Sequence, residues 1–189
     1  MERKHRKIGV LYVLDTLVIG GAEQLVLTLA RSLDPERFHV VVCTLFSRGE
    51  VPEALADEIR SLGIRVEQLA MTRWRDFDTM TRFTDLIDEE QIDIVHGHTV
   101  PADFWGCFLA KILKRRKTIY TKHDRFPRLG RANRFQRFIL DRILAERIVS
   151  ISGVVTDHLI RYCGVRPGRI VQIPNPVDTE RFRPDISGA

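Results

Sequence analysis

Seven short apolar segments alternate with segments of helical periodicity, and this alternation constrains the fold more than any other feature of the chain. Apolar runs bounded by charged residues are typical of strands buried on both faces of a parallel sheet. Helices between such strands provide the crossovers that parallel pairing requires. We therefore expect an α/β fold with a doubly wound, Rossmann-like parallel sheet of about seven strands. The expected strands are residues 8–14, 39–45, 64–69, 92–96, 118–121, 148–151 and 170–173, and the expected helices are residues 22–33, 52–62, 76–90, 101–113, 134–144 and 154–162.

Two adjacent glycines, Gly20 and Gly21, separate the first expected strand from the first expected helix. A glycine has no Cβ, so the backbone there can come close to a ligand. The unpaired N–H groups and the partial positive charge at the start of the next helix favour an anion. The pair could also serve only to turn the chain, and both interpretations stay open at this point.

Polar side chains follow four of the expected strands at their carboxyl ends. In a parallel sheet these ends lie along one rim, which also carries the glycine pair. Histidine, lysine, arginine and hydroxyl groups on one rim suit a phosphate-bearing ligand with many hydroxyls. A single histidine at a strand end is more often structural, but four successive clusters favour a site. We assign to substrate binding Gly20, Gly21, His98, Lys122, His123, Arg125, Ser152 and Asn175, and we assign no catalytic residue and no metal ligand.

Several common nucleotide and hydrolase signatures are absent from the sequence. The first turn lacks G-x-G-x-x-G, and no acidic residue ends the second expected strand, which argues against a nicotinamide-binding domain. No G-x-x-x-x-G-K segment occurs, so a P-loop is excluded. No G-x-S-x-G segment occurs either, which excludes the nucleophile elbow of α/β-hydrolases.

The basic residues are concentrated in one block. Thirteen Lys or Arg and three Asp or Glu lie between Lys111 and Arg147, a local charge of +10 in a chain whose net charge is +5. Such a block favours a surface that meets phosphates, anionic lipid or nucleic acid, although a merely solvated surface is the alternative. No recognised nucleic-acid motif accompanies the block, so we expect no nucleic-acid partner.

Part of this basic block has the spacing of a membrane-surface helix. In helix 134–144 and the residues before it, arginines recur every three residues and are expected on one side, with apolar residues on the opposite, core-facing side. An anionic membrane surface is therefore a possible partner, and a solvated helix is the alternative. The expected membrane-surface residues are Arg128, Arg131, Arg134 and Arg137, and the expected core-facing residues are Phe135, Phe138, Ile139, Ile143 and Leu144.

The remaining features favour a cytoplasmic protein, with peripheral attachment to the inner membrane face as an option. The three cysteines are odd in number and far apart, as expected for reduced thiols. No segment approaches the roughly 20 apolar residues of a membrane span. The basic start is followed by a strand-like segment without a cleavage site, so a signal peptide is not expected.

The ordered motifs G-G-A-E, DIVHGHT, IYTKHD, IVSISG and IPNPVDTERFRP resemble the N-terminal domain of retaining glycosyltransferases of family 4, which have the GT-B fold. The resemblance covers about residues 8–184 and departs from the family at Pro176, where glycine is usual. It implies a nucleotide-sugar donor, a sugar acceptor held mostly by this domain, and no cofactor. It also implies that the glycine loop approaches the donor phosphates and that His123 lies near the transferred sugar.

The same resemblance divides the chain at residue 173. Residues 1–173 correspond to the acceptor-side domain, and residues 174–189 to a linker toward a donor-binding domain that the sequence does not contain. We therefore expect the acceptor-side half of a glycosyltransferase, inactive alone, for a lipid, polysaccharide or small-molecule acceptor. A non-catalytic module that binds an acceptor or a membrane surface is the alternative.

We assign the two rim histidines separate roles, with His123 at the sugar site, as the resemblance implies, and His98 on the acceptor side. A neutral imidazole has one donor and one acceptor nitrogen, which suits sugar hydroxyls. Because the unperturbed pKa of histidine is about 6.5, we expect these rings to gain charge in mild acid, with a loss of activity.

Overall fold

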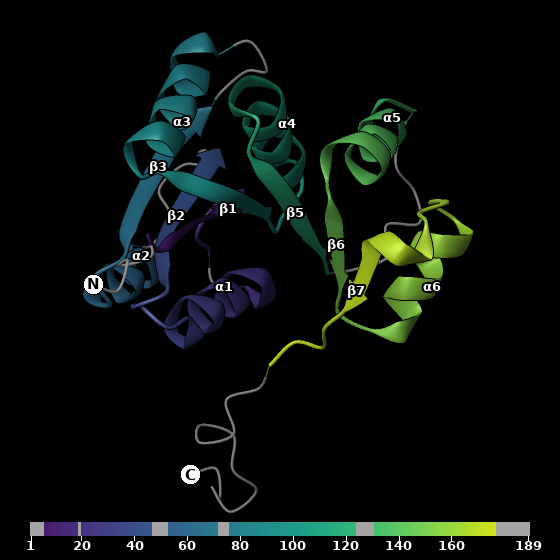
Figure 1. Cartoon of the computed structure of the whole chain (residues 1–189), viewed down its shortest axis with the longest axis horizontal. Coiled ribbons are helices and arrows are strands. Elements are labelled where there is room, and N and C mark those ends of the chain that lie inside the picture. Colours follow the sequence, from purple (N-terminus) through teal and green to yellow (C-terminus); the bar gives the residue numbers. More distant parts are fainter. Residues whose placement is uncertain (1–5, 19, 47–52, 72–75, 124–130, 177–189) are drawn as a thin grey trace, which may run out of the picture.

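The computed structural model describes residues 6–18, 20–46, 53–71, 76–123 and 131–176, with side chains in the last segment from residue 135 on. Its centre is one seven-stranded sheet in the order β3-β2-β1-β4-β5-β6-β7, in which every pair is parallel (Figure 1). The doubly wound α/β prediction is therefore confirmed. The strands are β1 (Ile8–Leu14), β2 (Phe38–Phe46), β3 (Arg65–Met71), β4 (Ile92–Gly97), β5 (Lys117–Lys122), β6 (Arg147–Ser150) and β7 (Ile170–Gln172).

Helices connect successive strands, and their ends follow local sequence signals. The Asp76 carboxylate accepts the N–H of Thr79 at the start of α3, and Gly63 and Gly164 end α2 and α6 with φ of 76° and 64°. Most boundaries lie within one or two residues of those expected. The helices are α1 (Gly21–Ser32), α2 (Ala54–Ser61), α3 (Phe77–Glu89), α4 (Ala102–Lys114), α5 (Arg131–Ile139), which continues as the π-helical turn η1 (Leu140–Leu144), α6 (Gly153–Arg161) and the short η2 (Pro167–Arg169).

The helices form a layer on each face of the sheet, with α1 and α2 on one face and α3, α4 and α5 on the other (Figure 1). Alternate residues of β1 face the two layers. Leu11 and Val13 pack with α3 and α4, whereas Tyr12 and Leu14 pack with α1 and α2. A third apolar cluster joins α4, β5, η1, β6 and α6. Burial on both faces is the reason that the strands are almost continuously apolar.

The direction of winding reverses between β1 and β4, which is where ligands bind in open α/β sheets. Here α4 begins directly against the end of β4. A Cβ atom on Gly97 would lie 2.6 Å from the Asp103 Cα, so only glycine fits at that position. The reversal therefore creates a rim on which the β1 and β4 loops are neighbours.

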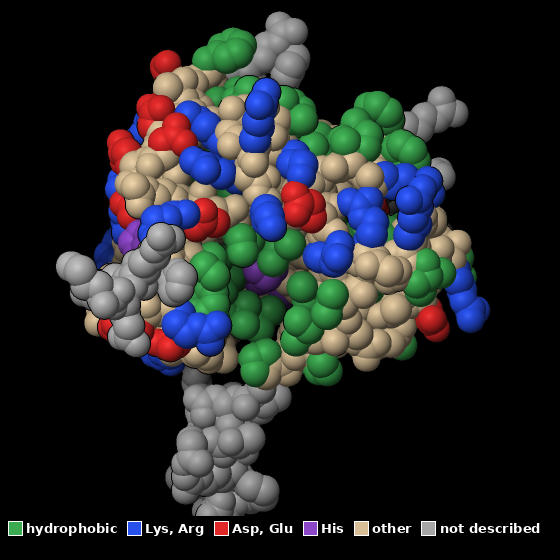
Figure 2. Space-filling model, viewed as in Figure 1, with side chains coloured by type: hydrophobic (Ala, Val, Ile, Leu, Met, Phe, Trp, Pro, Cys, Tyr) green, Lys and Arg blue, Asp and Glu red, His purple; other side chains and the backbone are tan. Residues whose placement is uncertain are grey.

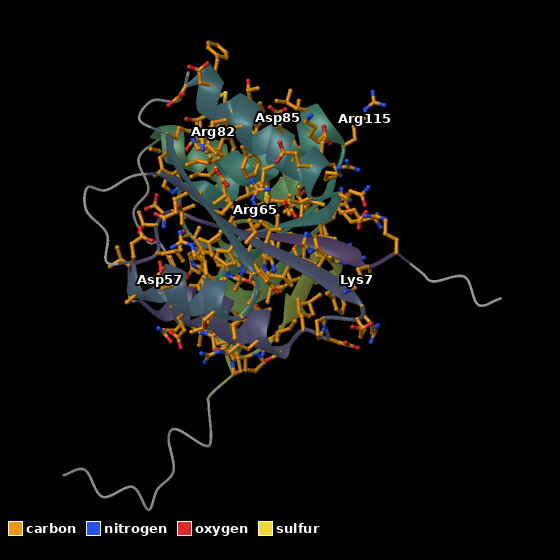
Figure 3. The ribbon with its side chains drawn as sticks, turned by 90° about the vertical axis from the view of Figure 1, so that its left-hand side faces the viewer. Lys7, Asp57, Arg65, Arg82, Asp85 and Arg115 are labelled. Atoms are coloured by element: carbon orange, nitrogen blue, oxygen red, sulfur yellow. The ribbon has the colours of Figure 1, made fainter. Side chains whose placement is uncertain are left out.

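The β3 edge of the sheet carries charged side chains rather than a site. Arg65 pairs with Glu67 and Glu90, and Arg82 pairs with Glu67 (Figure 3). These pairs are exposed and add little stability, but charge on an edge strand discourages pairing with another sheet.

Two further findings concern the described segments as a whole. None of their helices is long and apolar enough to cross a membrane. All three cysteines are free, with Cys43 and Cys107 buried. β7 ends at Gln172, and the proposed boundary at residue 173 stays a prediction because residues 177–189 lie outside the described part.

Candidate functional site

Three histidines and a tyrosine form an aromatic cluster at the carboxyl ends of β1, β4 and β5. The centroids of the His96 and His98 rings are 4.2 Å apart, and those of His98 and His123 are 5.6 Å apart. Tyr12 pairs with His96 in the sheet, and its ring centroid is 5.5 Å from the centroids of both His96 and His98. The structure therefore brings His98 and His123 together, as their shared rim predicts.

Burial makes His96 and His98 neutral groups. His98 is 2% exposed and His96 is 8% exposed. Desolvation lowers the pKa of His96 to about 3 and the pKa of His98 well below its usual value, and the neighbouring histidines add to both effects. The expectation that His98 gains charge in mild acid is therefore wrong, because the sequence does not reveal this desolvation.

The hydrogen bonding of the two buried rings differs. The His96 Nε2 lies 2.8 Å from the Thr121 hydroxyl, which fixes that ring. Neither ring nitrogen of His98 has a hydrogen-bond partner among the described residues. A buried polar atom without a partner costs about 1–3 kcal/mol, and such an atom in a native fold calls for an explanation. A ligand hydroxyl at His98 would supply the missing bonds.

Backbone contacts hold His98 beside the loop that follows β1. The His98 N–H donates to the Val13 carbonyl at 3.0 Å, and the Asp15 N–H donates to the Thr99 hydroxyl at 2.6 Å. The Asp15 carbonyl in turn accepts the Phe46 N–H. The ends of β2, β1 and β4 are thus joined at the point where the winding reverses.

The glycine pair starts α1, with Gly20 as an extended N-cap. A Cβ atom on Gly21 would have nothing within 4 Å, so the backbone there is open to a ligand. A Cβ atom on Gly20 would lie 2.5 Å from the Glu23 Oε2, so this carboxylate folds back over the helix start. Burial raises the pKa of Glu23, and Asp15 raises it further. The position that favours an anion thus already holds a carboxylate of the chain.

One face of the domain is hollowed. Figure 2 shows a depression near the middle of the visible face, lined by hydrophobic side chains, with a histidine side chain at its bottom. In the same view, α1 lies on one side of the depression and the β6–β7 end of the sheet on the other (Figure 1). An apolar hollow with a few polar groups at its base is the usual form of a small-molecule site.

Lys122 belongs to a different group from His98 and His123. It is buried and alternates along β5 with Thr121, which faces His96, so its side chain faces the α4–α5 layer. Its charge lowers the pKa of Asp103 and of Asp141, although burial raises both pKa values overall. The placement of Lys122 beside the histidines is therefore corrected, because side chains alternate between the faces of a strand.

Arg137 is the centre of this buried charge cluster and not a surface residue. It is 8% exposed, and its Nη1 lies 2.5 Å from the Asp103 Oδ2. Its guanidinium also stands over the Tyr120 ring at 4.8 Å, and the Tyr120 hydroxyl donates to Asp141. The expected membrane-surface position of Arg137 is therefore corrected: the buried carboxylates need a cation, and Arg137 supplies it.

The apolar side of α5 and η1 agrees only in part with the expectation. Leu144 is buried and Ile139 packs against the core as expected, whereas Phe135, Phe138 and Ile143 are exposed. Arg131 and Arg134 lie in α5, but only side chains from Phe135 on are described. Arg128 lies outside the described residues.

The other predicted site residues are dispersed. The Ser152 hydroxyl accepts the Val155 N–H at 3.3 Å and so caps α6. Asn175 is exposed beyond β7. Arg125 lies outside the described residues. Within the described part, no group of three or more His, Cys, Asp or Glu side chains is placed to hold a metal ion.

Sequence reasoning left out two residues of the site, His96 and Glu23. The motif DIVHGHT contains His96, but a single histidine at a strand end is more often structural. Glu23 ends the G-G-A-E motif, and its position three residues after an N-cap is a known capping signal that could have indicated it.

A family model named Glycosyltransferase Family 4 matches residues 19–181, most of the chain. The chain belongs to glycosyltransferase family 4. The match includes the glycine pair, the histidine cluster and the buried charge cluster, so the resemblance of the sequence motifs is confirmed.

Individual relatives agree with this family. The chain is 23% identical over 194 residues to the Escherichia coli UDP-Gal:alpha-D-GlcNAc-diphosphoundecaprenol alpha-1,3-galactosyltransferase, covering 99% of this chain and 49% of that enzyme. A glycosyltransferase structure from Rickettsia africae has a TM-score of 0.76 at 20% identity, covering 97% of this chain and 47% of that one. Anabaena Alr3699/HepE with UDP-glucose has a TM-score of 0.74 at 21% identity, covering 92% and 45%. This chain thus spans about half the length of each relative.

Proposed function

We propose that the chain is the acceptor-side half of a retaining glycosyltransferase, which moves a sugar from a nucleotide-sugar donor to an acceptor and is inactive alone. The proposal rests mainly on the environment of the His98 ring. Its ring is buried and neutral at the reversal of the sheet, and neither nitrogen is bonded within the described residues. Such a neutral ring can donate to one sugar hydroxyl and accept from another.

The glycine loop supports a role next to the donor phosphates. The open backbone at Gly21 and the start of α1 offer N–H groups to the developing charge of a leaving diphosphate. Glu23 lies over the same helix start, so it has to turn away when an anion binds. The remaining charge stabilisation would come from a donor-binding half, as the half-length coverage of the relatives suggests.

The class of acceptor is proposed from a relative. The Escherichia coli relative acts, by its name, on an N-acetylglucosamine linked to diphosphoundecaprenol. A lipid-linked sugar also suits a hollow with apolar walls and a histidine side chain at its bottom (Figure 2). We therefore rank a lipid-linked acceptor before a polysaccharide or a free small molecule.

The test measures binding to this chain by calorimetry with two probes. The first is N-acetylglucosamine diphosphate on a short, soluble prenyl chain, and the second is UDP-galactose. We expect the first to bind and the second to bind far more weakly, with no sugar transfer when both are present. His98→Phe should weaken binding of the acceptor probe about tenfold, since one to two hydrogen bonds are lost, whereas His158→Phe on α6 should not. Equal binding by wild type and His98→Phe would contradict the proposal.

A second candidate function is a binding module that holds an acceptor or a membrane surface without catalysis. The exposed side chains of Phe135 and Phe138 favour it. Joining a donor-binding half to this chain distinguishes the two candidate functions. Only a glycosyltransferase would then transfer sugar, whereas a binding module would not.

A further inference from the structure

The buried ion pair between Asp103 and Arg137 joins the beginning of α4 to α5, which lies on the same face of the sheet (Figure 1). The Arg137 Nη1 donates to the Asp103 Oδ2 at 2.5 Å, and the Asp103 Oδ1 accepts the Phe104 N–H at 2.6 Å. Both oxygens of this carboxylate are therefore bound. Asp103 is 2% exposed and Arg137 is 8% exposed, so the bonds are shielded from water.

The pair lies over the carboxyl ends of β4 and β5. Gly97, the last residue of β4, is the register partner of Tyr120 on β5. A Cβ atom on Gly97 would lie 2.6 Å from the Asp103 Cα. The Arg137 guanidinium stands over the Tyr120 ring at 4.8 Å. The pair therefore covers the point at which β4 ends and His98 follows.

Backbone bonds connect Asp103 to the residues around His98. The Asp103 N–H donates to the Thr99 carbonyl at 2.7 Å, and the Thr99 hydroxyl accepts the Asp15 N–H at 2.6 Å. On its other side, the His98 N–H donates to the Val13 carbonyl at 3.0 Å. The His98 backbone is thus fixed between β1 and the first turn of α4, whereas its ring makes no hydrogen bond within the described residues. A shift of the α4 start would therefore move the ring.

Stability alone does not account for a buried ion pair at this place. Apolar side chains of similar size usually stabilise a fold as well as a buried pair does, or better. Apolar packing has no direction, whereas hydrogen bonds between a planar guanidinium and a carboxylate fix both distance and direction. A side chain that binds a ligand has to be held to within about 0.5 Å by such supporting bonds. The pair is therefore suited to fix the start of α4.

We propose that Asp103, held by Arg137, is a positioning residue for His98. Through Thr99 it sets the His98 backbone at the rim, and so the place at which the neutral ring meets the acceptor. Asp103 and Arg137 are buried between the sheet and the helices, so neither contacts the acceptor itself. The link to the acceptor rests on the proposed function, whereas the position of the His98 ring is measured without a ligand.

The first measurement uses the chain alone. Nitrogen NMR spectra of the imidazole rings report on the His98 side chain, and amide hydrogen exchange reports on the backbone bonds of His98 and Asp15. In Asp103→Asn one acceptor oxygen becomes a donor, so the side chain no longer accepts both of its bonds. We expect the His98 ring resonances to move. The two amides should exchange about tenfold faster relative to the buried Val42 amide of β2, because a hydrogen bond to a charged group is lost.

Asp141→Asn is the matched control. Asp141 is 2% exposed, as Asp103 is, but within the described residues its hydrogen bond goes to Tyr120 on β5 and not to the loop after β4. It should destabilise the domain without moving the His98 resonances. Arg137→Lys keeps a positive charge beside both carboxylates, so it preserves the fold where Asp103→Asn does not, and it should move the His98 resonances because the planar guanidinium is lost. Equal changes in Asp141→Asn, or unchanged His98 resonances in both Asp103→Asn and Arg137→Lys, would overturn the proposal.

Calorimetry with the prenyl-linked N-acetylglucosamine diphosphate probe then connects the position of the ring to binding. Asp103→Asn should weaken binding by up to about tenfold, the loss expected for His98→Phe. In a His98→Phe background it should cause no further loss, because both residues act through the same ring. A full further loss in that background would mean that Asp103 acts independently of His98 and would overturn the proposal. Absence of probe binding by wild type would contradict the proposed function, whereas the spectra of the free chain would still decide the positioning role.

Discussion

The buried pair His96 and His98 should make the stability of the domain fall in mild acid. The folded state keeps both rings neutral, with the pKa of His96 at about 3 and that of His98 well below normal. In the unfolded chain both take up a proton near pH 6.5. Because the folded pKa values are depressed, the stability is complete above about pH 6.5 and is lost progressively as the pH falls toward the folded pKa values.

The size of the effect follows from the unfolded pKa alone while the folded rings stay neutral. Each histidine costs about 1.4 kcal/mol for each pH unit below about 6.5. Between about pH 7.5 and about pH 5.5 the pair should therefore lower the free energy of unfolding by about 3 kcal/mol. Tyr12 and His123, which also contact His98, do not offset this loss: desolvation raises the pKa of Tyr12 to about 12, and a charged His123 would only repel a second proton.

The assay is urea unfolding at several pH values, for wild type and for His98→Gln. Glutamine keeps one donor and one acceptor but does not titrate, so the difference between the two proteins isolates His98. The loss between about pH 7.5 and about pH 5.5 should be smaller in the variant by about 1.4 kcal/mol. The same pH dependence in both proteins would mean that His98 is protonated in the folded state, and the reasoning about its neutrality would fail.

Two further predictions concern the rim beside this pair. Gly97→Ala should lower the free energy of unfolding by more than about 2 kcal/mol, because its Cβ would meet the Asp103 backbone at 2.6 Å. Gly21→Val, which has open space at its Cβ, is the control, and both are measured by urea unfolding. A larger loss of stability in Gly21→Val than in Gly97→Ala would contradict this account of how α4 packs against β4. Glu23→Gln should increase the affinity of the chain for inorganic pyrophosphate several-fold, because it removes a negative charge from the start of α1. Calorimetry measures this affinity, with Glu58→Gln on α2 as a control. Unchanged binding in Glu23→Gln would show that Glu23 does not compete with an anion for the start of α1.

The sequence by itself determined the elements and their order. The apolar run Ile8–Leu14 is a strand in the structure with the same bounds, and the other strands and helices lie close to the expected segments. This agreement has a local cause, since periodicity and glycine stops act within a few residues of the chain. The shared rim of strand ends also follows from parallel pairing, which is why His98 and His123 were placed together correctly.

Only the tertiary structure decided how side chains at these positions are used. Arg137 turns inward because its partner Asp103 is 34 residues away along the chain, and no helical spacing can reveal that partner. Lys122 and His123 are consecutive, yet Lys122 faces buried carboxylates while His123 joins the histidine cluster. The neutrality of His98 likewise depends on desolvation by elements that meet only after folding. Burial and charge pairing are properties of the assembled domain, so a local pattern does not fix them.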